Sequence, residues 1–278
     1  MIQKILSLTL PLIIAILPVR SVELQRVILA TNNNPNYIQF WPIVAPLWQA
    51  MGFHPTLALI ADENCPIDTS LGDVIRFHPL PDVAESTQAQ AIRLLLPALF
   101  PEDTCLISDI DMLPVSPSYF REGIAQCHED AFVVYRDCAH GCGYPHYPMC
   151  YNAAKGKVFA SIFEVSTPQN IRDKISQWGS YGLGWNTDEL LMYLFLDQWE
   201  RKGGHIVRLG HGVERRIDRL YWPTDLETLD ISQYIDCHCP RPYENNAESI
   251  NKIAAAILLH IIKEKDFSKQ ETCNVEPF

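Results

Sequence analysis

The chain has 278 residues, of which 47% are hydrophobic and 20% are charged. This length suits one large α/β domain or two small ones, and it is enough to bury a sizeable core. The formal net charge is −11, so the chain lacks the positive surface that binding to nucleic acid requires. Nucleic acid is therefore excluded as a partner. A small anionic ligand remains open, because it needs only a local metal ion or arginine.

The N-terminus carries an uncharged apolar segment, residues 5–19, between Lys4 and Arg20. A membrane-spanning helix needs about 20 such residues, whereas a segment of this length matches the core of a signal peptide. No clear small-x-small cleavage site follows it. We therefore predict a signal peptide or short membrane anchor over residues 1–22. Such a segment implies membrane association or export, to the secretory pathway and Golgi lumen in a eukaryote or to the cell envelope in a bacterium.

Strand-like and helix-like patterns alternate along the first half of the chain. Apolar strand-like runs cover residues 26–31, 54–61, 73–80, 103–111 and 131–136, and helical spacing of apolar residues covers 37–52, 85–100 and 116–127. Such alternation predicts an α/β sheet with mainly parallel strands.

Two polar clusters follow strands of this predicted sheet. Residues 32–36 come after the first strand, and residues 109–111 end the fourth. Open α/β sheets bind ligands outside the carboxyl ends of their strands. The two clusters are therefore expected to line one crevice, although about 75 residues separate them along the chain.

The second half of the chain is less regular. Helical patterns cover 186–204 and 246–265, a short strand pattern covers 205–209, and residues 137–150 form a loop rich in Cys, His, Tyr, Gly and Pro. We predict a single domain over residues 23–265, followed by a flexible polar tail over 266–278.

The chain has nine cysteines, and an odd number leaves at least one of them outside any intramolecular disulfide. Cys105 lies in an apolar strand pattern and is expected to be a buried thiol. The loop over 137–150 allows three arrangements. It could form a Cys138–Cys150 or Cys142–Cys150 disulfide, keep free thiols, or bind zinc through Cys138, His140, Cys142, His146 and Cys150.

Asp109 and Asp111 form a D-x-D pattern directly after an apolar run and before "MLP". In an extended segment side chains alternate between faces, so the two carboxylates are expected to point the same way. Two carboxylates together with a diphosphate make a good site for Mg²⁺ or Mn²⁺, which prefer oxygen ligands. The alternative is a solvated turn at the end of a strand.

Five segments, in the same order, resemble the GT-A glycosyltransferases, particularly the family-eight group of glycogenin-like enzymes and bacterial lipopolysaccharide galactosyltransferases. The longest, residues 85–116, looks like the donor-site helix, strand and D-x-D of that family, and the others are 27–37, 150–159, 185–195 and 236–243. The resemblance implies a GT-A fold, a Rossmann-like mixed sheet flanked by helices in a single domain. It also implies a metal-dependent glycosyltransferase that moves a sugar from a nucleotide diphosphate sugar, a UDP-sugar above all, to a glycan, lipid or protein acceptor with retention of configuration.

Roles for individual residues follow from the same resemblance. It implies Mn²⁺ (or Mg²⁺) held by Asp109, Asp111 and His238. It places Asp188 and Glu189 as catalytic residues beside the sugar. Donor-binding residues would be Ala30, Thr31, Asn32, Tyr37, Arg93, Asn152, Ala153 and Arg241.

This sequence departs from the family pattern in two places that bear on the site. The late motif is shorter than in the family, which makes Asp236 an alternative to His238 as the third metal ligand. Glu189 stands where the family has glutamine. The loop over 137–150 would lie on the acceptor side, where the rings of His140, Tyr144, His146 and Tyr147 suit a polyhydroxylated acceptor.

Other interpretations of these residues remain open. Haloacid-dehalogenase-like phosphatases also end a strand in D-x-D, with a nucleophilic first Asp, but Leu113 stands where they need Thr or Val. A non-catalytic, exported sugar-binding protein on a transferase scaffold is a third interpretation. Single residues also have structural alternatives: a surface helix position or a salt bridge for Arg93, core packing for Tyr37, and for Asp188 with Glu189 the stabilisation of a helix N-terminus.

Overall fold

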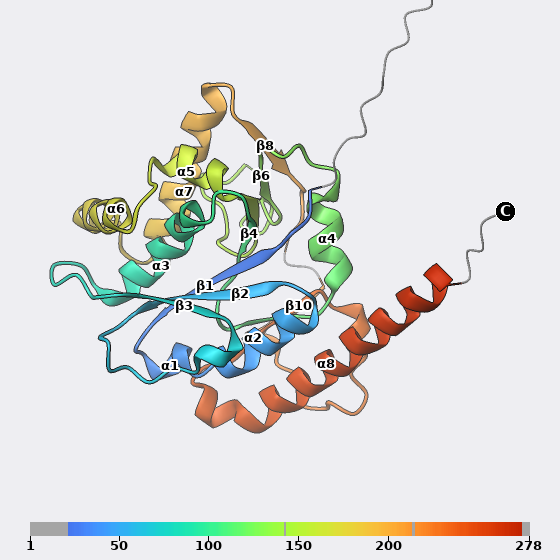
Figure 1. The fold of residues 1–278 in the computed structure, drawn as a ribbon. Helices are drawn as coiled ribbons and strands as arrows, with labels where there is room; N and C mark the ends of the chain where they lie inside the picture. Colours follow the sequence, from blue (N-terminus) through green and yellow to red (C-terminus); the bar gives the residue numbers. More distant parts are fainter. Residues whose placement is uncertain (1–21, 142, 213–214, 274–278) are drawn as a thin grey trace, which may run out of the picture.

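The computed structural model describes residues 22–141, 143–212 and 215–273, with the backbone alone for 266–273. The predicted signal peptide or anchor therefore lies outside the described residues, apart from Val22. The centre of the molecule is a seven-stranded mixed sheet in the order β3-β2-β1-β4-β7-β6-β8 (Figure 1). Its strands are β1 (Arg26–Asn32), β2 (His54–Ile60), β3 (Asp73–Phe77), β4 (Thr104–Ile107), β6 (Ala131–Val134), β7 (Asn152–Lys155) and β8 (His205–Arg208).

Most strand pairs in this sheet are parallel, as the alternating sequence pattern predicted. β1 pairs in parallel with β2 and β4, β2 with β3, and β6 with β8. The exception is β7, which runs antiparallel to both β4 and β6. No strand was predicted there, because β7 has only four residues and two of them are alanines. The predicted mixed α/β sheet is confirmed.

Helices cover both faces of the sheet (Figure 1). On one face, α3 (Glu85–Leu95), α5 (Gly156–Phe163), α6 (Pro168–Ser180) and α7 (Thr187–Arg201) share a core with the sheet. The opposite face packs against α2 (Trp41–Ala50), α4 (Pro117–Ala125) and α8 (Tyr243–Cys273). The helix predicted over 37–52 is divided, because a separate turn, α1 (Pro35–Ile38), precedes α2. The predicted boundary at residue 265 falls inside α8.

The helix predicted over residues 85–100 ends early. α3 stops at Leu95, and a 3-10 turn, η2 (Leu96–Leu99), follows it. Pro97 lies in this turn, and a proline has no N–H with which to continue an α-helical ladder. The backbone carbonyl oxygens of Pro97, in this turn, and of Phe100, which follows it, lie against Gly156 at the start of α5.

Replacing Gly156 with alanine tests this close approach. An alanine Cβ would lie 2.1 Å from the Phe100 carbonyl oxygen and 2.4 Å from that of Pro97. Backbone atoms cannot move aside as a side chain can, so we expect Gly156→Ala to lower the free energy of unfolding by about 1–3 kcal/mol. Chemical denaturation measures it. Ser161→Ala, at an exposed position of the same helix, is the control and should change stability by less than about 0.5 kcal/mol.

A second, three-stranded sheet brings residues 236–238 next to the D-x-D segment. Its order is β5-β10-β9, formed by β5 (Met112–Pro114), β10 (Asp236–His238) and β9 (Arg216–Ile217). β10 runs antiparallel to β5, with His238 opposite Met112. This register places His238 beside Asp111, which directly precedes β5.

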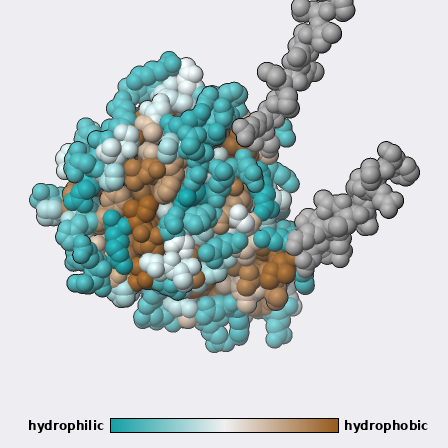
Figure 2. Space-filling view, in the orientation of Figure 1, coloured by the Kyte–Doolittle hydropathy of each residue, from teal (hydrophilic) through white to brown (hydrophobic). Residues whose placement is uncertain are grey.

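In the part of the chain that the structure describes, we find no helix with the length and apolar character to cross a membrane. Figure 2 shows apolar surface over the later turns of α8, where Leu258, Leu259 and Ile262 are exposed. The predicted membrane association rests on the N-terminal segment, which lies outside the described residues, and stays a prediction.

Candidate functional site

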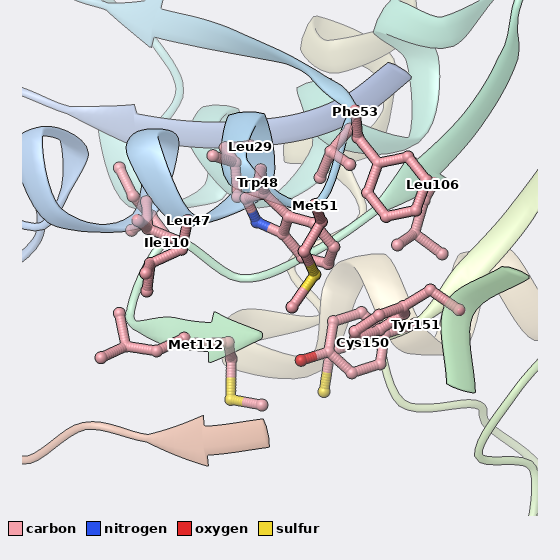
Figure 3. Packing of buried hydrophobic residues seen from close by; sticks show 14 of the residues in the cluster. Leu29, Leu47, Trp48, Met51, Phe53, Leu106, Ile110, Met112, Cys150 and Tyr151 are labelled. Carbon is pink, nitrogen blue, oxygen red and sulfur yellow. The ribbon is translucent and has the colours of Figure 1, made fainter. Parts of the chain in front are cut away.

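The D-x-D segment is a turn between two strands and not the end of one strand. β4 stops at Ile107, four residues earlier than predicted, and β5 begins at Met112. Ile110 is 3% exposed and belongs to the core cluster that contains Leu47 and Trp48, as Figure 3 shows. A buried isoleucine between the two aspartates fixes the turn, so that both aspartates face away from this core.

The two aspartates open into a cavity of about 390 Å³. It lies at the carboxyl ends of β1 and β4, where the sequence predicted a crevice. Its lining is unusually rich in charged groups, with five arginines and four carboxylates. These are Arg93, Arg136, Arg216, Arg219, Arg241, Asp109, Asp111, Asp188 and Glu189.

Most residues predicted for the site line this one cavity, although they come from five separate stretches of the chain. They are Ala30, Thr31, Asn32, Tyr37, Arg93, Asp109, Asp111, Asp188, Glu189, His238 and Arg241. Of the predicted set, Asn152 and Ala153 do not line it. Both are fully buried in β7, and the Asn152 amide donates hydrogen bonds of 2.9 and 2.8 Å to the carbonyls of Pro148 and Met149. The cavity wall there consists of Pro148, Met149 and Cys150.

Arg93 joins the two acidic parts of the site. Its Nη1 donates to Asp109, and its Nη2 donates to Asp188 Oδ2 at 2.7 Å. Asp188 is 2% exposed, and its other oxygen accepts the backbone N–H of Glu189 at 2.9 Å. Asp188 and Glu189 lie in the first turn of α7, where the helix dipole favours negative charge. Arg93 therefore forms the salt bridge that was the alternative to a site role, and it does so inside the cavity.

Asp111 faces three cationic groups at distances slightly longer than hydrogen bonds. Its Oδ2 lies 3.3 Å from Arg241 Nε, and 3.6 Å from both Arg219 Nη1 and His238 Nε2. A carboxylate and an imidazole nitrogen at this separation are suited to a divalent cation such as Mn²⁺. Asp109 is less available, because it is bound to Arg93. The donor set thus fits a cation at Asp111 and His238, and Asp109 would join them only on leaving Arg93.

Asp236, the alternative to His238 as a metal ligand, lies in the core. It is fully buried, and its Oδ1 accepts from Arg216 Nε at 2.8 Å while its Oδ2 accepts from Arg136 Nη2 at 3.0 Å. Both oxygens are therefore occupied, and Asp236 does not line the cavity. Between the two candidates, the geometry favours His238.

Tyr37 is paired with Arg241 at one end of the cavity. The Arg241 guanidinium lies over the tyrosine ring, 4.7 Å from its centroid, and Nη1 donates to the phenol oxygen. Burial lowers the pKa of Arg241, but an arginine stays charged at any physiological pH. The predicted stacking of a base on Tyr37 would have to use the ring face that Arg241 leaves open.

Sequence reasoning missed three cavity arginines, Arg136, Arg216 and Arg219. Arg136 is 1% exposed, and its Nε and Nη1 have no hydrogen-bond partner among the described residues. Burial by itself lowers the pKa of Arg136, but the nearby Asp236, Cys150 and Tyr151 together outweigh burial and raise it. Buried guanidinium donors without partners next to a cavity indicate an anionic ligand. The only sequence signal was that Arg136 ends a predicted strand, as the D-x-D does.

In the loop over residues 137–150, the cysteines are not paired as predicted. Cys138 is disulfide-bonded, but Cys150 is a buried free thiol whose Sγ accepts from Arg216 Nη2 at 3.3 Å. Both predicted disulfides through Cys150 are therefore wrong, and so is a zinc site made from Cys138 and Cys150. Cys105 is a buried thiol as predicted, and burial raises its pKa.

Two of the aromatic residues predicted for an acceptor have different surroundings. Tyr147 is buried, and its hydroxyl accepts from Arg208 Nε at 2.7 Å, so it does not face the cavity. Tyr144 is 50% exposed and packs edge-on against His146, with ring centroids 4.5 Å apart. Another exposed aromatic side chain, Trp185, lines the cavity and is 65% exposed.

Comparison with known proteins gives similarity of structure and none of sequence. No family model matches the chain, and no curated protein matches it. It is similar to the galactosyltransferase LgtC solved with donor and acceptor sugar analogs, at 13% identity and a TM-score of 0.46 over 84% of this chain and 96% of that one. It is also similar to the glycosyltransferase GlyE of Streptococcus pneumoniae TIGR4, at 15% identity and a TM-score of 0.48 over 87% of this chain and 64% of that one. Similarity of this extent says nothing about reaction or substrate.

Proposed function

We propose that this protein is a metal-dependent glycosyltransferase that uses a nucleotide diphosphate sugar, a UDP-sugar above all, as its donor. The observation that carries the proposal is the charge pattern of one cavity. Five arginines and four carboxylates line it together, in a chain whose net charge is −11. A diphosphate needs the arginines, and a sugar beside it uses the carboxylates for its hydroxyls and for its anomeric carbon.

Each part of the cavity has a distinct task in such a transfer. Arg241 and Arg219, beside Asp111, would neutralise the nucleoside diphosphate that leaves. Arg136 would offer the N–H groups of its two unpartnered nitrogens, Nε and Nη1, to the same charge. When bound at Asp111 and His238, a divalent cation supplies Lewis-acid stabilisation of the leaving group. Asp188, which Arg93 holds at the cavity wall, would accept hydrogen bonds from the sugar through the remaining lone pairs of its oxygens.

Glu189, which lines the cavity one residue after Asp188, would stabilise the positive charge that develops at the anomeric carbon. Transfer with retention of configuration is proposed from the sequence resemblance alone. The acceptor would be a glycan, a glycolipid or a glycoprotein. The outer part of the cavity, around Trp185 and His140, is the side from which it would enter.

A panel of nucleotide sugars tests the proposal directly. The melting temperature of the full-length chain is measured with UDP- and GDP-sugars, each with and without Mn²⁺. A ligand that binds the native state raises the melting temperature, by an amount that corresponds to about 2.7 kcal/mol at one hundred times its dissociation constant. We expect the donor to give the largest metal-dependent rise and to be slowly hydrolysed. Hydrolysis of a simple phosphomonoester without any effect of nucleotide sugars would instead indicate a phosphatase.

Trp185 is expected to bind sugar without stabilising the fold. It is 65% exposed at the edge of the cavity, and an exposed ring can cover the apolar face of a sugar. We expect Trp185→Ala to raise the KM for donor or acceptor by about tenfold, which corresponds to about 1.4 kcal/mol. The change in unfolding free energy should stay below about 0.5 kcal/mol. Leu194→Ala, an exposed position on α7 outside the cavity lining, is the control and should leave KM unchanged.

A further inference from the structure

Two histidines of the loop over residues 137–150 meet Glu189 at the cavity wall. His146 Nδ1 lies 2.9 Å from Glu189 Oε2, and His140 Nε2 lies 3.4 Å from the same oxygen. The two imidazole rings are 4.5 Å apart between centroids. One possible metal-ligand atom from each of the three side chains lies within 4.8 Å of the other two. Among the described residues, no other group of three His, Cys, Asp or Glu side chains meets this condition.

We propose that His140, His146 and Glu189 form a second metal site, suited to Zn²⁺ and open toward the cavity. Two imidazoles and one carboxylate are a known zinc ligand set when a fourth position is left for water or substrate. Ligand atoms that share one zinc ion, at about 2.0–2.1 Å each, lie about 3–4 Å apart. The distances at Glu189 are close to this spacing, so only small movements would be needed to bind the ion.

The fold holds all three ligands around one point. Glu189 is fixed in the first turn of α7, and its Oε2 faces both imidazoles. Gly141 and Gly143 have positive φ angles of +98° and +82°, which bend the loop and bring His140 back over His146. His146 is 9% exposed and Tyr144 packs against it, so its ring is held in place.

The open position has access to the ligand of the cavity. His140 and Glu189 both line the cavity, whereas His146 does not. This zinc site shares no residue with the cation site proposed at Asp111 and His238, which has one imidazole where the zinc site has two. Zinc would occupy the carboxylate that the proposed function places at the anomeric carbon, so Zn²⁺ is expected to inhibit where Mn²⁺ activates.

The competing explanation is a hydrogen-bonded cluster without metal. One protonated imidazole can donate to Glu189 at these distances, and the second can share the same oxygen. The two explanations differ in metal affinity. They do not differ in the effect of a mutation on activity, so binding has to be measured.

Zinc binding by the full chain, without a histidine tag, decides between them. Competition with a chromogenic Zn²⁺ indicator should give one tight site, weakened at least about 100-fold by His146→Gln and by His140→Gln. His140→Gln carries little risk to folding, because its side chain is 37% exposed. His78→Gln, at an exposed histidine paired with Asp62, is the matched control and should bind zinc as the unmodified chain does.

Asp111→Asn separates the two metal sites. We expect it to leave zinc affinity unchanged within about twofold, whether or not the protein proves to be a glycosyltransferase. Loss of zinc binding in Asp111→Asn would place the ion at the other site and overturn the inference. Zinc binding that is absent, or that survives both His140→Gln and His146→Gln, would overturn it as well.

Discussion

Asp111→Asn should lower metal-dependent hydrolysis or transfer from the best nucleotide sugar by about 100- to 1000-fold. Asp111 is the one carboxylate of the cavity that faces an imidazole and two guanidinium groups at once, each at 3.3–3.6 Å. An amide is a poor ligand for a hard divalent cation. The variant should therefore lose its response to Mn²⁺, measured as the change in rate on adding the ion.

For nucleoside diphosphate binding without metal, we expect the opposite effect of Asp111→Asn. Removing a negative charge from beside Arg219, Arg241 and His238 makes this end of the cavity more positive. Binding of the nucleoside diphosphate in the absence of metal should therefore be kept or become tighter, as isothermal titration would measure. Asp82→Asn, at an exposed turn outside the cavity, should leave both quantities unchanged. Full activity and full metal dependence in Asp111→Asn would contradict the proposed cation site.

Asp236→Asn should lower the free energy of unfolding by about 3–5 kcal/mol. The carboxylate is fully buried between Arg136 and Arg216, whose side chains are 1% and 9% exposed. Neutralising it leaves two buried guanidinium groups with one neutral acceptor between them, and a buried charge without its partner is costly. Urea denaturation, read by circular dichroism, measures the loss.

An exposed ion pair supplies the comparison. Asp197 and Arg201 form an i,i+4 pair on α7 with side chains 40% and 78% exposed, and such pairs contribute only about 0.3–0.5 kcal/mol. Asp197→Asn should therefore change stability by less than about 0.5 kcal/mol. A loss below about 1 kcal/mol in Asp236→Asn would show that this pair does not hold the core. A stable Asp236→Asn variant that no longer responds to Mn²⁺ would make Asp236 a metal ligand after all.

The sheet was largely predictable from sequence, because its strands carry strong local signals. Six predicted strands correspond to β1, β2, β3, β4, β6 and β8, each an apolar run next to turn residues. Errors occurred where local pattern was weak. β7 is short and alanine-rich, α5 and α6 fell in a region without clear periodicity, and the D-x-D was assigned to a strand although it forms a turn.

The predicted site residues divide in a similar way. Asp109 and Asp111 were recognisable because they follow a buried strand, and Asp188 and Glu189 because they begin a helix. Asn152 was predicted from the family resemblance alone, and its amide instead donates to the backbone carbonyls of Pro148 and Met149. An asparagine looks the same in a sequence whether its amide meets a ligand or the backbone of its own loop.

The sequence by itself determined where most strands of the sheet lie along the chain, since hydrophobic period and chain-reversing residues are local properties. It could not decide between Asp236 and His238, two residues apart in one short strand. That choice depends on the antiparallel register of β10 with β5, which sets His238 opposite Met112 and Asp236 opposite Pro114. Two residues of a strand span about 6.6 Å, so His238 reaches Asp111 while Asp236 meets Arg216 of β9. Pairing between segments more than 100 residues apart exists only in the folded chain, and it decides which carboxylates and arginines share the cavity.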